Sequence, residues 1–194
     1  MGGGIWFTSA DTGFFAIGDS QYSNSWIMKT NDGGVSWDTS YANLSMWISY
    51  IFFPNSLDGY ATSSNGIVLK TVNGGNSWTV SYSGTSFWMS GIYFFDGSYG
   101  FTGGGDFNSG NGTIFSTGNG GTNWTPVYTG PGGISKICFS DYSTGYAIAS
   151  GNTGGGVLLN TYDSGTTWNV EFTPGDSLRG IHFPDPFTGY AVGN

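Results

Sequence analysis

The side chains that could take part directly in chemistry are few in this chain. Its 194 residues include twelve acidic groups, one histidine, His182, and one cysteine, Cys138. Two carboxyl groups at a set separation could hydrolyse a glycoside, whereas one histidine and one cysteine exclude two-histidine and cysteine-rich metal sites within the chain. We predict that the protein is not an enzyme, that it has no catalytic or metal-binding residue, and that it uses no cofactor.

One motif with an Asp or Asn recurs four times and ends in tryptophan. It reads Thr-x-Asx-Gly/Ser-Gly-x-x-Trp, and its tryptophans are 41 to 46 residues apart; we call these segments the tryptophan turns. The Asx side chain can accept backbone hydrogen bonds in a tight turn, and glycine supplies a positive φ. Because two of the four Asx residues are Asn, we predict a role in turns rather than catalysis for Asp32 and Trp37, Asn73 and Trp78, Asn119 and Trp124, and Asp163 and Trp168.

A second motif, Ile-x-Phe, is followed six residues after its Phe by Gly and an aromatic residue. It occurs five times, starting at Ile5, Ile51, Ile92, Ile137 and Ile181. The x position holds Trp6, Phe52 and Tyr93 in three units, and Cys138 and His182 in the other two. We therefore predict that Cys138 and His182 are ordinary occupants of a packed strand position.

The elements that must position these motifs are short strands. Glycine makes up 36 residues, aromatics 18% and charged residues only 8%, a mixture that favours strands joined by tight turns. Each unit reads as strand A with Ile-x-Phe, strand B with Gly-aromatic, strand C before the tryptophan turn and strand D after it. Four strands in a repeat of this length are typical of a β-propeller blade. We predict one all-β propeller over 1–194, with repeats 5–46, 47–87, 88–132 and 133–176 and a half-repeat 177–194, so that four complete blades and a half-blade could close as five.

The tryptophan turn resembles the Asp-box, or bacterial neuraminidase repeat. The whole unit is similar to the repeats of photosystem II assembly-factor-like propellers, as found in secreted repeat proteins of Bacteroidota-type bacteria, and the resemblance runs from Ile5 to Asn194. It implies a propeller fold and a structural Asp-box. A sialidase would need three arginines around the substrate carboxylate and a Tyr/Glu nucleophile pair, whereas this chain has one arginine, Arg179, and one glutamate, Glu171.

A ligand is expected on the face that carries the B-to-C and D-to-A loops, with the tryptophan turns on the opposite face. The B-to-C loops are predicted at 19–25, 63–66, 103–112 and 150–155. Candidate contacts are residues that only some units possess and that could stack on or bind a sugar or peptide: Trp47, Trp88, Tyr22, Trp26, Asp106 and Phe107. The alternative for these residues is rim packing between blades.

The charge pattern limits the partners. The net charge of −8 would repel nucleic acid. The sequence contains no run of eighteen apolar residues, so we expect no membrane insertion. We expect an extracellular or cell-surface location, and Asn43, Asn111 and Asn123 stand in glycosylation sequons.

The half-repeat leaves two readings open: a fragment of a longer propeller, or a subunit whose open strand edge pairs with a neighbour. The predicted function is a non-catalytic extracellular structural or protein-interaction module, whose partner is a protein, a glycan or another copy of itself. The alternatives are a carbohydrate-binding or sialidase-like glycosidase propeller and an assembly factor for a membrane protein complex.

Overall fold

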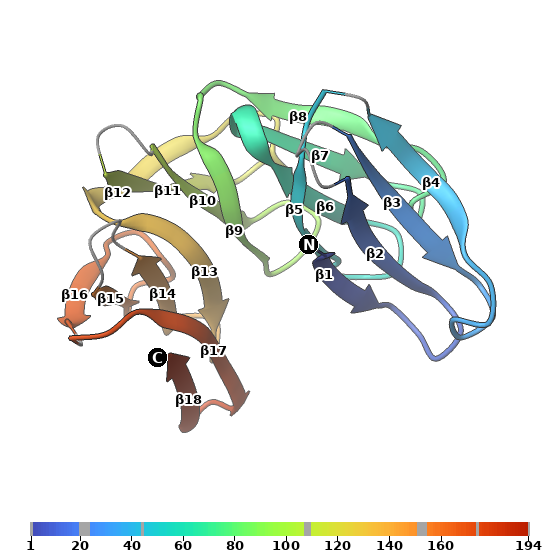
Figure 1. Ribbon diagram of the computed structural model, residues 1–194. Coiled ribbons are helices and arrows are strands. Elements are labelled where there is room, and N and C mark those ends of the chain that lie inside the picture. Colours follow the sequence, from blue (N-terminus) through green and yellow to red (C-terminus); the bar gives the residue numbers. More distant parts are fainter. Residues whose placement is uncertain are drawn as a thin grey trace.

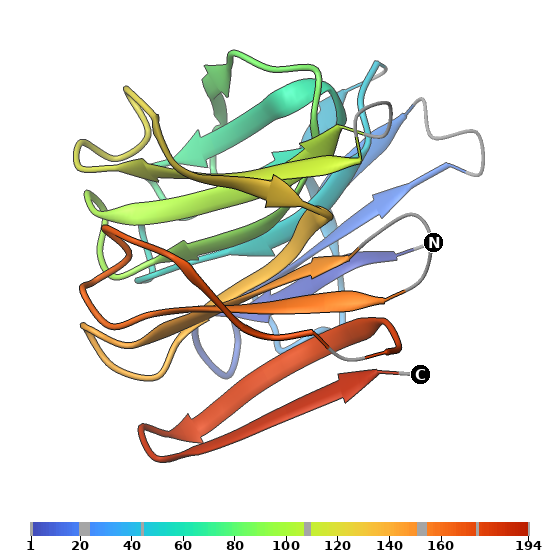
Figure 2. The ribbon, with the colours of Figure 1, turned by 90° about the vertical axis from the view of Figure 1, so that its left-hand side faces the viewer.

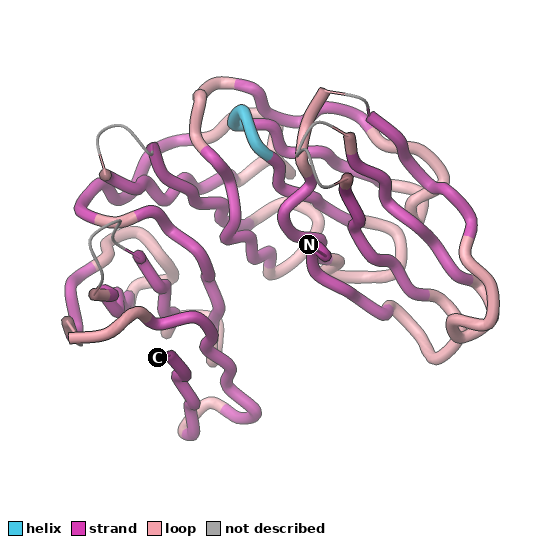
Figure 3. Tube along the Cα trace, viewed as in Figure 1, coloured by secondary structure: helices cyan, strands magenta, loops and turns pink. Residues whose placement is uncertain are grey.

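The computed structural model describes residues 2–19, 24–43, 45–106, 110–150, 155–173 and 175–193. Over these residues the chain forms eighteen β-strands and one short 3-10 turn, η1 (Ser64–Gly66). Figure 3 shows strands throughout the molecule and the single helical turn between two of them. The all-β prediction is therefore confirmed.

Sixteen of the strands form four antiparallel sheets, each a meander of four consecutive strands. The first sheet contains β1 (Gly2–Phe7), β2 (Gly13–Gly18), β3 (Ser25–Thr30) and β4 (Asp38–Asn43). The second contains β5 (Ile48–Phe52), β6 (Gly59–Ser63), β7 (Ile67–Thr71) and β8 (Thr79–Ser83). The third contains β9 (Trp88–Phe94), β10 (Gly100–Asp106), β11 (Asn111–Thr117) and β12 (Thr125–Pro131). The fourth contains β13 (Gly133–Phe139), β14 (Gly145–Ser150), β15 (Gly156–Thr161) and β16 (Asn169–Phe172).

A two-stranded sheet, β17 (Leu178–Asp185) and β18 (Thr188–Gly193), follows the fourth blade. The sheets succeed one another around an arc, with the first strand of each sheet toward its concave side (Figure 1). Seen from the side, the hairpin lies at one end of this series (Figure 2). The fold is thus a β-propeller of four complete blades and a half-blade. Among the described strands, no backbone pairing joins the hairpin to the first blade.

The constant six-residue step between Phe and Gly follows from the register of each A–B hairpin. Phe139 pairs with Gly145, and Phe7 with Gly13 in the same way. The phenylalanine ring lies over its glycine so closely that a Cβ on Gly145 would be 2.5 Å from the Phe139 ring. Glycine at this position therefore makes room for the ring, and the pair fixes the hairpin register.

Each tryptophan turn is held by its Thr and Asx side chains. In the first, the Thr30 hydroxyl donates to Asp32 at 2.7 Å and accepts from the Gly34 amide at 2.9 Å. The Asp32 carboxylate also accepts from the Ser36 amide at 2.9 Å. In the other three turns, the side chains of Asn73, Asn119 and Asp163 accept the equivalent hydrogen bond from a backbone amide. All four Asx side chains therefore hold their turns closed.

Consecutive blades pack through a repeated ring pair. The aromatic residue of strand B in one blade stacks on the strand A phenylalanine of the next. The ring centres of Phe14 and Phe53 are 4.3 Å apart. The same contact recurs between Tyr60 and Phe94, Phe101 and Phe139, and Tyr146 and Phe183. The rings of the first three pairs belong to the apolar core between blades.

Backbone hydrogen bonds assign the loops to two faces. The Gly33 amide of the first tryptophan turn donates to Asp11 in the A-to-B loop, at 2.8 Å. On the other face, the Gly66 amide of a B-to-C loop donates to Phe87 just before strand A, at 2.7 Å. The predicted division of the faces is confirmed. The B-to-C loop predicted at 103–112 is wrong in extent, because β10 continues to Asp106 and β11 begins at Asn111.

Candidate functional site

The side chains at the x position of Ile-x-Phe form a row of rings along the concave side of the arc. Trp6 and Phe52 have ring centres 4.6 Å apart, and Phe52 and Tyr93 follow at 5.4 Å. The rings come from β1, from β5 and from β9, so the row crosses three blades. The next unit has Cys138 at this position, whose small side chain ends the row.

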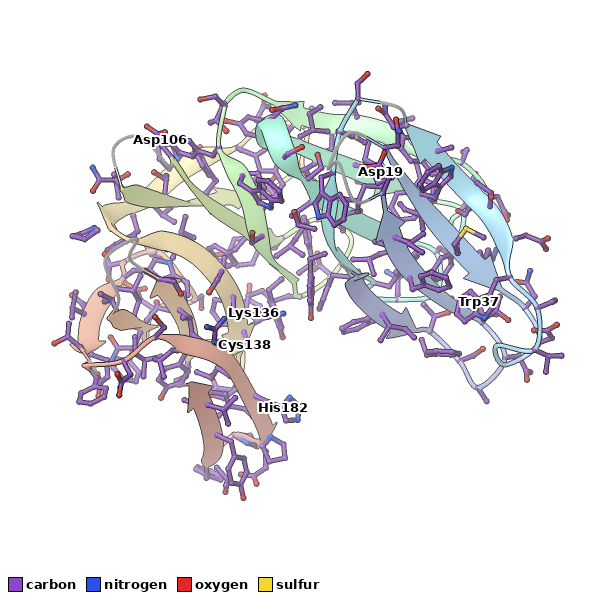
Figure 4. The ribbon with its side chains drawn as sticks, viewed as in Figure 1. Asp19, Trp37, Asp106, Lys136, Cys138 and His182 are labelled. Atoms are coloured by element: carbon purple, nitrogen blue, oxygen red, sulfur yellow. The ribbon has the colours of Figure 1, made fainter. Side chains whose placement is uncertain are left out.

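A hollow opens beside the end of this row. Its volume is about 570 Å³, and it is bordered by the inner strands from β1 to β17 and by β18. Its polar lining consists of Tyr50, Tyr93, Lys136, Cys138, His182 and Tyr190, while the rest is apolar or glycine. Figure 4 shows Lys136 and Cys138 on β13, and His182 on β17, at the concave side of the arc. No described Asp or Glu lines the hollow.

The prediction for Cys138 and His182 is therefore wrong in part. Cys138 is half-buried, but His182 is exposed, and both line the hollow instead of a closed core. Burial raises the pKa of the Cys138 thiol to about 12. The thiol is thus protonated at neutral pH, which makes it a poor nucleophile.

Lys136 is the one cation of the described hollow lining. Its ammonium lies 3.9 Å from the centre of the Tyr50 ring, a close cation–π contact. Burial lowers the pKa of Lys136, because desolvation disfavours its charged form, while the nearby Cys138 has the opposite, smaller effect. A cation among aromatic rings is able to bind an anionic or π-rich group.

The predicted ligand contacts are not gathered in this hollow. Trp47 is only 5% exposed, and its ring lies against Gly18 of the preceding blade, where a Cβ would be 2.2 Å away. Half-buried Trp88 donates its indole N–H to the Ser49 hydroxyl of the preceding blade at 2.7 Å. Both tryptophans therefore pack between blades.

The other predicted contacts lie apart. Trp26 is half-buried in the middle of the first blade, opposite Ile17 and Ala42. Asp106 ends β10 and pairs with Asn111, at the edge of the molecule in Figure 4, far from Lys136. Tyr22 and Phe107 lie outside the described residues.

Five of the acidic side chains accept backbone hydrogen bonds in turns, namely Asp32, Asp96, Asp141, Asp163 and Asp185. Hydrogen bonds from Ser36 and Thr30 lower the pKa of Asp32 to about 2. Asp163 has a lowered pKa for the same reason, with Thr167 as its principal donor. After strand A, the turn acceptors are Ser9, Asn55, Asp96, Asp141 and Asp185. In the first two units this position is filled by Ser9 and Asn55, so Asp11 and Asp58 are not equivalent to Asp96.

Two structural features are absent from the residues that the structure describes. No group of three or more His, Cys, Asp or Glu side chains in that part of the chain is placed to hold a metal ion. Within the same residues, no helix is long and apolar enough to cross a membrane.

The fold and the hollow together define a propeller with an open central site, and comparison with solved structures agrees on the fold. The GH74 enzyme of Niastella koreensis superposes with a TM-score of 0.66 at 16% identity, over 84% of this chain and 28% of that one. YCF48 from Cyanidioschyzon merolae has a TM-score of 0.63 at 17% identity, over 94% of this chain and 60% of that one. A protein from Lactobacillus plantarum has a TM-score of 0.68 at 11% identity, over 97% of this chain and 63% of that one.

At these identities the likeness concerns the fold alone. The chain spans about 28% to 63% of the length of these three structures. No family model and no curated protein sequence matches the chain.

Proposed function

We propose that this chain is a non-catalytic protein-interaction module of the cell exterior and that it binds its partner in the central hollow. The observation that carries the proposal is the separation of two sets of residues. Five acidic side chains are held in turns and no described acidic residue lines the hollow, which presents aromatic rings and a few polar groups, as binding pockets commonly do. The location is supported by the resemblance to secreted repeat proteins, and antibody staining of intact cells tests it.

Cys138→Tyr is the sharpest variant for testing the hollow. Tyr93 already occupies the equivalent position in another blade, so the fold accommodates tyrosine there. The added ring would extend the aromatic row into the hollow. Peptides selected from a displayed library on the natural chain should bind the variant at least about tenfold more weakly. Failure to select any peptide, or equal binding to both proteins, would refute binding in the hollow.

Self-association is a second candidate, and one observation favours it. Within the arc, the strand A phenylalanines Phe53, Phe94 and Phe139 are at most 8% exposed, because each is covered by the preceding blade. Phe7 has the same repeat position but is 44% exposed, and Tyr190, which could supply the covering ring, is 62% exposed. The two rings are complementary halves of the repeated contact, so Tyr190 of one copy could cover Phe7 of another.

Mixing two variants separates this candidate from closure of the ring within one chain. Phe7→Asp and Tyr190→Asp each spoil one half of the contact and should be monomeric by light scattering. Their mixture should form a one-to-one dimer, because each retains the half that the other lacks. If the natural chain is monomeric, or the mixture does not associate, self-association is wrong.

Two other functions have direct tests. A panel of fluorogenic glycosides and a glycan array examine the glycosidase and carbohydrate-binding alternatives, and hydrolysis would overturn the non-catalytic proposal. Co-purification with a membrane protein complex would favour an assembly factor.

A further inference from the structure

One position of the repeat distinguishes two blades from the others. The residue just before the Ile of Ile-x-Phe is glycine in three units, namely Gly4, Gly91 and Gly180, but it is Tyr50 and Lys136 in the remaining two. These two side chains come from β5 and from β13, which are not neighbouring inner strands. They meet at the hollow, where the Lys136 ammonium lies 3.9 Å from the centre of the Tyr50 ring. Side chains that replace glycine in only two units and meet there are not needed to build a blade.

The other lysines show what this chain does with a cation that has a structural task. Lys29 donates to the Gly74 carbonyl at 2.8 Å and to the Asn76 side-chain oxygen at 3.0 Å. Lys70 donates to the Gly120 carbonyl at 2.9 Å. Both therefore join a blade to the tryptophan turn of the next one.

Lys136 has no such task in the described residues. Its ammonium lies on the face of the Tyr50 ring and near Cys138, neither of which is a hydrogen-bond acceptor of the carbonyl kind, and no described carboxylate lines the space around it. The titratable groups of that space are Tyr50, Tyr93, Cys138, His182 and Tyr190. A half-buried ammonium has three donors to satisfy, and a bound anion would satisfy them best.

We infer that the hollow binds a peptide carboxylate on the Lys136 ammonium, with the apolar part of the peptide against Phe52 and Tyr93. The inference rests on the proposed function and adds the chemistry of the ligand. A single carboxylate fits a single cation on a chain of net charge −8, which would repel a polyanion. A peptide fits better than a sugar because the lining is mainly aromatic and aliphatic and offers few polar groups for hydroxyls.

The test compares two forms of one probe. The peptide acetyl-glycyl-leucyl-phenylalanine, with a free carboxylate or with a terminal amide, is titrated to about 10 mM into the isotope-labelled full chain and followed by NMR, so that even millimolar binding is detected. The free carboxylate should shift the signals of Lys136 and Cys138 and bind at least about tenfold more tightly than the amide, since a charge-assisted hydrogen bond is lost in the amide.

Three variants assign the effect to the ammonium. Lys136→Met keeps the length of the side chain but should weaken carboxylate binding at least about tenfold, whereas Lys136→Arg should retain it. Lys70→Met is the matched control, because Lys70 also lies over a tyrosine ring, 5.5 Å from the centre of Tyr60, but outside the hollow. Its binding should stay within about twofold of the natural chain.

The outcomes separate this inference from the proposed function. If the free peptide and its amide bind equally tightly in the hollow, and Lys136→Met binds both as tightly as the natural chain does, the hollow remains a binding site but the carboxylate inference is wrong. Tighter binding of inorganic phosphate or glucuronate than of the peptide carboxylate would also overturn it. Absence of any shift at the highest peptide concentration would contradict the inference directly.

Discussion

The Tyr60 ring lies flat on the Phe94 ring, with centres 3.6 Å apart and planes inclined by 5°. Tyr60 belongs to strand B of the second blade and Phe94 to strand A of the third, so this contact joins two repeats. The Tyr60 hydroxyl also donates to the Gly97 carbonyl of the third blade, at 3.0 Å. The repeated aromatic pair therefore links consecutive blades.

Removal of this ring should destabilise the whole arc. Tyr60→Ala deletes a fully buried ring and should lower the free energy of unfolding by about 3–5 kcal/mol, measured by urea denaturation. Tyr60→Phe loses only the hydrogen bond to Gly97 and should cost about 1 kcal/mol. Tyr190→Ala is the control at the same repeat position, where the ring is exposed, and an equal loss there would contradict the interblade role.

A glycine of the tryptophan turn gives a second test of blade packing. Gly75 has a φ of +73°, and a Cβ on it would be 2.4 Å from the Phe14 ring of the preceding blade. Gly34 has the equivalent position and a φ of +93°, but its nearest neighbour is its own Trp37 at 3.6 Å. Gly75→Ala should therefore lower the thermal unfolding temperature more than Gly34→Ala, although both carry the strain of a positive φ. Equal shifts would mean that Phe14 does not pack on this turn.

The thiol of Cys138 should react slowly. Because burial raises its pKa to about 12, very little thiolate exists at pH 8, and maleimide labelling of the folded chain should be at least about tenfold slower than labelling in denaturant. Lys136→Met should slow the reaction further, since the ammonium favours the thiolate. Labelling at the rate of an exposed thiol would show that the hollow does not bury Cys138.

Much of the blade could be predicted from the sequence because its determinants are local. The Phe-to-Gly step of Phe139 and Gly145 reports a hairpin register, and the spacing of Thr30, Asp32 and Trp37 reports a closed turn. Both depend on residues that are close in the sequence. Their repetition predicted the four complete blades and the half-blade.

The hollow could not be predicted in the same way because it depends on how the blades curve around it. Local alternation places Lys136 and Cys138 on one face of their strand, but whether that face is covered depends on Trp6, Tyr50 and Tyr93 from other blades. Trp47 packs between blades, which was the alternative for this residue, and its burial depends on Gly18 in the preceding blade rather than on its own neighbours in the sequence. One signal was available, since Tyr50 and Lys136 interrupt a position that is otherwise glycine.

The role of Asp32 and Asp163 in their turns also predicts a pH dependence. Hydrogen bonding lowers the pKa of Asp32 to about 2, below the value of about 3.9 expected in the unfolded chain. The carboxylate therefore stabilises the fold above that unfolded value, and this stabilisation is lost as the pH falls toward 2. The pKa of Asp163 is also lowered, so its carboxylate should likewise stabilise the fold less as the pH falls.

The double variant Asp32→Asn/Asp163→Asn tests this central claim most directly. Asn73 and Asn119 already close the same turn, so the variant should fold. Urea denaturation at a series of pH values should show the natural chain as the more stable form at pH 7, with the difference shrinking between about pH 4 and pH 2. A difference that stays constant over this range, or a variant that does not fold at pH 7, would contradict the account.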